Sequence, residues 1–161
     1  MRTLISNIVG VAFVAAVPAT AQASPADTIE VRLRYSEVVC GGYCPNIEIR
    51  VTPAGWITSK SLWHHGSTYR WKANGSQVDA FQSILATVRP SGDEQLDKSC
   101  HPSDLRGNPR PDDLAVRWIG VGSSASLTSC GGTHPPVRDV VERAIRALGV
   151  DLITGKKTPQ T

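Results

Sequence analysis

Residues 29–35 read Ile-Glu-Val-Arg-Leu-Arg-Tyr, and this alternation of apolar and charged side chains decides the expected fold. A period of two with one apolar side is typical of a β-strand that buries only one of its faces. Residues 46–52 repeat the pattern, with Ile47, Ile49 and Val51 on the apolar side. The sequence therefore predicts a sheet that packs against a core on one face.

Further along the chain, four more segments show strand patterns and two segments show helical patterns. The strand patterns cover residues 56–64, 68–72, 114–121 and 125–129. The first helical stripe follows Ser76, the expected N-cap, with Asp79 expected in the first turn and Arg89-Pro90 at the end. The second stripe follows Pro136, the expected first helical residue, and Gly149 is its expected stop.

A long segment, residues 90–113, separates the first helix from the last two strands and contains four prolines. Loops of this length are usually functional, disordered or held in place by a cross-link, and Cys100 favours a cross-linked loop. Because short turns join consecutive strands, we expect antiparallel pairing. The sequence predicts one α+β domain over residues 29–152, in two layers, with a mainly antiparallel sheet of about six strands. Both helices are expected on one face of the sheet, and disulfide bonds are expected to cross-link the domain.

Residues 1–23 have the layout of a secretory signal peptide. Arg2 gives a positive start, an apolar run covers residues 4–17, and Ala21-Gln22-Ala23 is a small-x-small cleavage site. The run of about 14 residues is shorter than the ~20 that a membrane-spanning helix needs. We expect a periplasmic or secreted protein with no stable membrane insertion after cleavage, and a retained anchor is the alternative. Residues 24–28 would be a polar lead-in and residues 153–161 a polar tail.

The cysteines are the strongest chemical signal, because disulfides persist in exported proteins. Cys40 and Cys44 would be about 13 Å apart in an extended strand, too far for a bridge that needs about 4.4–6.8 Å between Cα atoms. The two glycines between them let the chain fold back and close that gap. Cys100 and Cys130 would then form a second bridge, although four cysteines allow three connectivities.

Two other interpretations of the cysteines stay open. A thiol–disulfide redox site would use Cys40 and Cys44, but their spacing is one residue longer than C-x-x-C. A strand pattern follows them, so the activating helix N-terminus is missing. A metal site would combine cysteines with His101 and His134, which a 100–130 bridge would bring into one region.

Residues 40–45, Cys-Gly-Gly-Tyr-Cys-Pro, are followed by an alternating strand and resemble the C-x-G-x-C-P signature of a family of bacterial secreted or envelope domains. Similarity to the longer, proteobacterial-type members extends over residues 89–92, Cys100, residues 116–118 and Cys130. The resemblance spans residues 29–150. It implies an exported domain with two separate bridges, 40–44 and 100–130, and because the family has no established activity it implies no chemistry.

Charge and motifs argue against several function classes. The formal net charge of +3 is too small to indicate a nucleic-acid-binding protein. The sequence has no nucleophile elbow, no H-E-x-x-H zinc motif and no phosphate-binding loop, so we expect no cofactor. Asp112 and Asp113 are adjacent carboxylates at the end of a proline-rich loop, where such groups are usually solvated. A non-catalytic protein is favoured, and a site assembled only in three dimensions is left open.

Aromatic side chains are the candidates for a binding face. Those on predicted strands are Trp56, Trp63, Tyr69, Trp71 and Trp118. They either pack beneath the helices or form an exposed strip that stacks on a glycan or holds a peptide. Basic and imidazole side chains accompany such a strip, namely His64, His65, Arg70 and Lys72. Within it the candidate binding residues are Trp63, His64, Tyr69 and Trp71.

The expected function is an exported, non-catalytic module that binds a partner protein or a component of the cell envelope. One alternative is a metal-binding protein or enzyme with a site around His101 and His134. A second alternative is a redox protein that uses Cys40 and Cys44. The partner itself is not identified by any motif.

Overall fold

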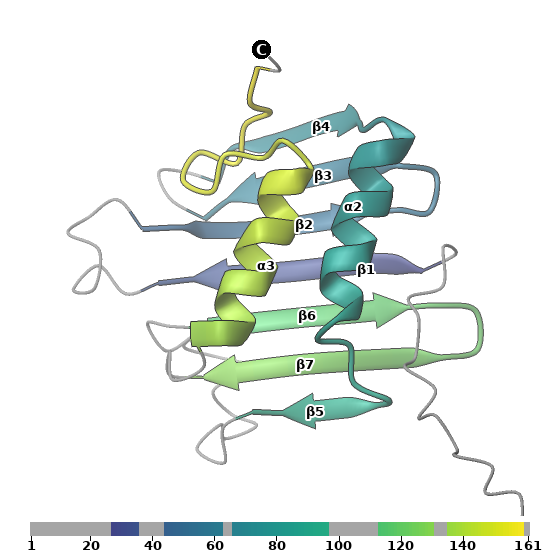
Figure 1. Cartoon of the computed structure of the whole chain (residues 1–161). Helices are drawn as coiled ribbons and strands as arrows, with labels where there is room; N and C mark the ends of the chain where they lie inside the picture. The colour runs from purple at the N-terminus through teal and green to yellow at the C-terminus, as the bar shows by residue number, and fades with distance from the viewer. Residues whose placement is uncertain (1–26, 36–43, 63–65, 97–112, 131–134, 160–161) are drawn as a thin grey trace, which may run out of the picture.

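A single mixed sheet organises the protein, and two helices cover one of its faces (Figure 1). The structure is a computed structural model that describes residues 27–35, 44–62, 66–96, 113–130 and 135–159. The strands in chain order are β1 (Thr28–Arg34), β2 (Asn46–Val51), β3 (Trp56–Ser61), β4 (Thr68–Lys72), β5 (Asp93–Gln95), β6 (Asp113–Ile119) and β7 (Ser124–Cys130). The helices are α2 (Gly75–Ala86) and α3 (Pro135–Ala147).

The strand order across the described sheet is β4-β3-β2-β1-β6-β7-β5. Neighbouring strands are antiparallel except β5, which runs parallel to β7. The α+β class and the two helices on one face are confirmed. The expected count of about six strands is wrong, because the sheet has seven. The missed strand, β5, lies within residues 90–113 and consists of three exposed polar residues, which carry no alternating pattern and have low strand propensity.

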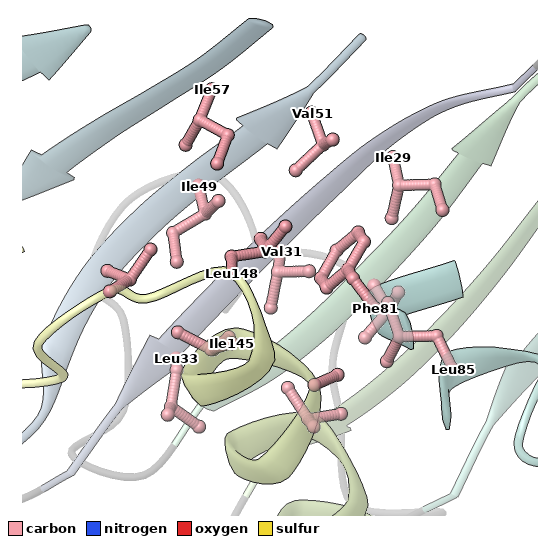
Figure 2. Close-up of a cluster of buried hydrophobic side chains, with 14 of the residues drawn as sticks. Ile29, Val31, Leu33, Ile49, Val51, Ile57, Phe81, Leu85, Ile145 and Leu148 are labelled. Carbon is pink, nitrogen blue, oxygen red and sulfur yellow. The ribbon is translucent and has the colours of Figure 1, made fainter. Parts of the chain in front are cut away.

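Alternation fixes which side of each strand enters the core. Ile29, Val31 and Leu33 of β1 are buried, and their partners across β2 and β6 are apolar as well. The two helices bury Phe81, Leu85, Ile145 and Leu148 against this face, as Figure 2 shows. The buried apolar cluster therefore lies on the helix side of the sheet, beneath the two helices and the turn that follows α3, and the other face of the sheet carries charged side chains.

The start of α2 differs from the expected one. Asn74, not Ser76, is the N-cap: its Oδ1 accepts the Gln77 backbone N–H at 2.8 Å, and the Gln77 side chain accepts the Asn74 backbone N–H at 3.2 Å. This reciprocal capping box satisfies two backbone donors, whereas the Ser76 hydroxyl donates to Asn74 Oδ1. No acidic residue lies in the first turn, so the expected role of Asp79 there is also wrong.

The other boundaries differ by a few residues. Helix α3 begins at Pro135, one residue before the expected start. Strand β6 ends at Ile119 and β7 already begins at Ser124. Gly149 does end α3: it has φ +70° and its N–H donates to the Arg146 carbonyl at 2.9 Å.

Residues 150–158 are folded back, although a polar tail was expected from residue 153. Asp151 accepts the backbone N–H groups of Ile153 and Thr154 at 3.1 and 2.7 Å, and Val150 forms a β-bridge with Lys157. The bond from the Thr154 N–H holds the pKa of Asp151 below its ordinary value. Leu152 is buried, so this turn adds to the core.

Gly155 fixes this turn against β3, and we expect Gly155→Ala to destabilise the protein. Gly155 has φ +69°, and a Cβ would lie 2.8 Å from Ser59 Oγ. A left-handed backbone with a side chain costs about 1–2 kcal/mol before any clash. Gly92→Ala is the matched control, because nothing lies within 4 Å of a Cβ there and its φ is not positive. Urea unfolding should show a loss of more than about 1 kcal/mol for the first variant and less than about 0.5 kcal/mol for the control; equal losses would contradict the packed turn.

Candidate functional site: the open face of the sheet

No described helix covers the face of the sheet that lies opposite α2 and α3 (Figure 1). A depression of about 670 Å³ runs across it, from β3 and β4 over β2 and β1 to β6 and β7. Small side chains form much of its lining, namely Thr58, Ala115, Ser126 and Thr128. We call this surface the open face. A depression of this size matches the volume of known ligand clefts.

Charged side chains line the depression, and cations outnumber anions. Arg32 lies 2.8 Å from Glu48, while Arg50 and Arg117 lie 3.6 and 3.9 Å from Glu30. The register explains these pairs, because Glu30 is directly opposite both Arg50 and Arg117, and Arg32 is opposite Glu48. Two carboxylates thus meet three guanidinium groups, and one positive charge remains uncompensated in the centre of the open face.

The β3–β4 side of the open face carries more positive charge. Lys72 is directly opposite Trp56, Arg70 is opposite Thr58, and Lys60 is opposite Thr68. In the described part of the chain, none of the three cations has a carboxylate within 4.0 Å. Trp56 is 40% exposed, and the Arg70 guanidinium lies 4.8 Å from its ring centroid. We call Trp56, Lys60, Arg70 and Lys72 the cationic patch.

The candidate aromatic residues are divided between the two faces. Tyr69 is opposite Ser59 and Trp71 is opposite Ile57, so both point to the helix side, where Trp71 packs against the core. Trp118 is fully buried there. Tyr69 and Trp71 therefore do not share a face with Arg70 and Lys72. Trp63 and His64 lie outside the described residues, as does His65.

Trp56 is the aromatic residue that joins the basic side chains on the open face. It was among the candidate aromatic residues but not among the four expected binding residues. The signal was available: Trp56 precedes the inward Ile57, so the period of two places it outward. Placing it beside Lys72 also needed the β3–β4 register, which the sequence between these two strands does not specify.

The residues considered for metal binding, redox chemistry and acid–base catalysis are mostly outside the described part of the chain. This holds for Cys40, Cys100, His101, His134 and Asp112, while Asp113 opens β6. Cys130 ends β7 opposite Asp113. Cys44 is fully buried and disulfide-bonded. Among the described residues, no group of three or more His, Cys, Asp and Glu side chains is placed to hold a metal ion.

A second cluster of polar groups lies where β1 ends against α3. The Tyr35 hydroxyl donates to Glu142 Oε1, and the Arg138 guanidinium lies 4.2 Å from the Tyr35 ring centroid. Arg138 is buried and donates to the Arg34 carbonyl at 3.1 Å. Burial, and next the bond to Glu142, raise the pKa of Tyr35 to about 12. A phenol that holds its proton this tightly cannot serve as a base near neutral pH, so this cluster fastens α3 to the sheet.

The Tyr35 pKa gives a direct prediction for alkaline titration. The protein has three tyrosines, and ultraviolet absorbance should show one phenolate forming near pH 12, a step that Tyr35→Phe removes. The folded pKa lies above the unfolded value, so the unfolded chain loses its proton first and stability falls as pH rises from about 10 to about 12. If the step that Tyr35→Phe removes lies near pH 10, the ordinary value for tyrosine, the cluster is contradicted.

Comparisons with known proteins give no relative: no family model and no curated protein matches the chain. Within the described residues, no helix is both long enough and apolar enough to cross a membrane. The function is therefore inferred from the geometry of the open face.

Proposed function

We propose that this protein is an exported, non-catalytic binding module of the periplasm or cell envelope that holds an anionic partner on the open face. The observation that carries the proposal is the excess of uncompensated cations on an uncovered, hollowed face. Such a surface attracts anions at long range and presents several donors at once. The small side chains in the depression leave room for a ligand to approach the backbone of the sheet.

Features outside the open face agree with export. The signal-peptide pattern of residues 1–23 and the even number of cysteines are typical of proteins that mature in an oxidising compartment. We propose the pairs Cys40–Cys44 and Cys100–Cys130, in line with the resemblance to the C-x-G-x-C-P family. Burial of Cys44 supports a structural bridge, because thiol exchange requires access to a sulfur atom.

Mass spectrometry of the exported protein tests this part of the proposal. The mature chain should begin at Ser24, and non-reducing peptide maps should show the two proposed pairs. Four free thiols, or a zinc ion bound by them, would overturn the disulfide framework and favour the metal-binding alternative around His101 and His134.

Charge reversal on the open face tests the binding surface. Fluorescent poly-glutamate should bind the mature protein, and the double variant Lys60→Glu, Arg70→Glu should weaken that binding at least ~10-fold, which corresponds to ~1.4 kcal/mol. The matched control is Arg143→Glu, Lys156→Glu, which changes the net charge equally on exposed side chains outside the open face. Affinity should also fall with added salt. Equal losses for both double variants, or no binding at all, would contradict the proposed surface.

A further inference from the structure

We propose that the exposed edge of β4 accepts an extended acidic segment of a partner protein as an additional strand. This inference rests on the proposed function and names the class of partner. Strand addition to a free sheet edge is a recurrent way in which proteins recognise peptides, with main-chain hydrogen bonds supplying affinity and side chains supplying specificity.

The pattern of hydrogen bonds between β3 and β4 shows which backbone groups of β4 are available to an added strand. Ser61 N–H donates to the Ser67 carbonyl at 3.0 Å, and Ala73 N–H donates to the Gly55 carbonyl at 2.9 Å. In an antiparallel ladder, the backbone N–H and C=O groups of the odd-numbered β4 residues between these two bonds point toward β3. The backbone groups of the even-numbered residues point away from it. The backbone groups of Thr68, Arg70 and Lys72 therefore point away from β3, and β4 is the last strand on this side of the described sheet.

The same three residues place their side chains on the open face. They are exposed, unlike Tyr69 and Trp71, which point to the helix side. A strand added to β4 would lie about 4.8 Å away, with alternate side chains directly opposite Arg70 and Lys72. Carboxylates at those alternate positions would meet the Arg70 guanidinium and the Lys72 ammonium group, neither of which has an acidic partner within the described chain.

The charge of the edge selects among possible partners. Two copies of this chain meeting edge to edge would bring Arg70 and Lys72 of one copy against those of the other, and like charges directly opposite are destabilising. Basic side chains on a short edge strand block self-association in many proteins. An acidic segment converts this repulsion into attraction, so the edge favours such a partner over a second copy.

Position-specific N-methylation of a peptide tests strand addition. The probe is a fluorescent peptide of about six residues that alternates Glu and Val, a typical strand length. Methyl groups on the amides that would face β4 should weaken binding to the mature protein at least ~10-fold. Methyl groups on the alternate amides, which would face solvent, should leave affinity within ~3-fold, and charge is identical in the two peptides.

A charge variant of the protein separates this inference from the proposed function. Arg70→Glu should weaken binding of the unmethylated peptide at least ~10-fold, and Arg143→Glu should not. If Arg70→Glu weakens binding but both methylated peptides bind equally, the open face holds anions without strand addition and the inference fails. If neither Arg70→Glu nor methylation changes affinity, the inference and the proposed surface both fail.

Discussion

Arg89→Met is expected to destabilise the protein by about 3–5 kcal/mol, because it leaves a buried carboxylate without its cation. Arg89 Nη1 lies 2.6 Å from Asp27 Oδ2, and the two side chains are only 10% and 2% exposed. The pair connects the chain just after the end of α2 to the start of β1. Asp27 also packs closely against Gly120, where a Cβ would lie 2.5 Å from Asp27 Oδ1.

The free energy of unfolding in urea measures this effect, and a double variant is its control. Replacing both partners by apolar side chains, Asp27→Leu with Arg89→Met, removes the stranded charge and should recover part of the loss. Arg89 also lies over the Trp118 ring, 5.8 Å from Arg89 Cζ to the ring centroid, so full recovery is not expected. A single variant within about 1 kcal/mol of wild type would show that the pair is accessible to water, contrary to the structure.

Two tryptophans on opposite faces give the second large effect. Trp118 is fully buried beneath the helices, and Trp118→Ala is expected to cost about 3–5 kcal/mol through lost burial and the cavity left behind. Trp56 lies on the open face, where its contact with Arg70 contributes about 0.5–1 kcal/mol. Trp56→Ala should therefore cost less than about 1 kcal/mol.

The same chemical change thus distinguishes the covered face from the open one. Urea unfolding under non-reducing conditions measures both variants, and unchanged m-values show that the difference is one of stability. Equal losses would mean that both faces of the sheet are covered, which would remove the proposed binding surface. A stable Trp118→Ala would place Trp118 outside the core.

The sequence predicted the parts of the fold that short periodic segments determine. The alternation of Ile29, Val31 and Leu33 identified the buried face of β1, and Gly149 marked the end of α3 because the left-handed conformation there suits glycine. The order of the strands was not predictable in this way. Pairing of β1 with β6 joins segments about 85 residues apart, and no local pattern specifies such a long-range contact.

Errors occurred where tertiary packing or side-chain competition decided the outcome. Strand β5 forms because residues 93–95 reach the β7 edge, where Ser126 Oγ donates to Asp93 Oδ1 at 2.6 Å. Asn74 displaced Ser76 as N-cap because Gln77 at the third helical position completes a reciprocal pair. The turn after Val150 depends on Asp151 and on the close approach of Gly155 to Ser59, and both features require the folded sheet.

The candidate site was predictable only in part. Period-two alternation predicted that Tyr69 and Trp71 share a face, and their partners Ser59 and Ile57 on β3 agree with this. Arg70 and Lys72 were expected beside these aromatic side chains, but the structure places them on the opposite face. The cationic patch also depends on Trp56 and Lys60 lying on the adjacent strand in a particular register, and on the ion pairs that neutralise Glu30 and Glu48. These cross-strand relations come from the assembled sheet.

Amide chemical-shift mapping of the ¹⁵N-labelled protein, titrated with the acidic peptide, tests the central claim most directly. The largest shifts are expected at Lys60, Thr68, Arg70 and Lys72, with progressively smaller ones across β2 and β1. Shifts concentrated on α2 and α3, or no shift at saturating peptide, would contradict the claim that the uncovered face of the sheet is where this protein meets its partner.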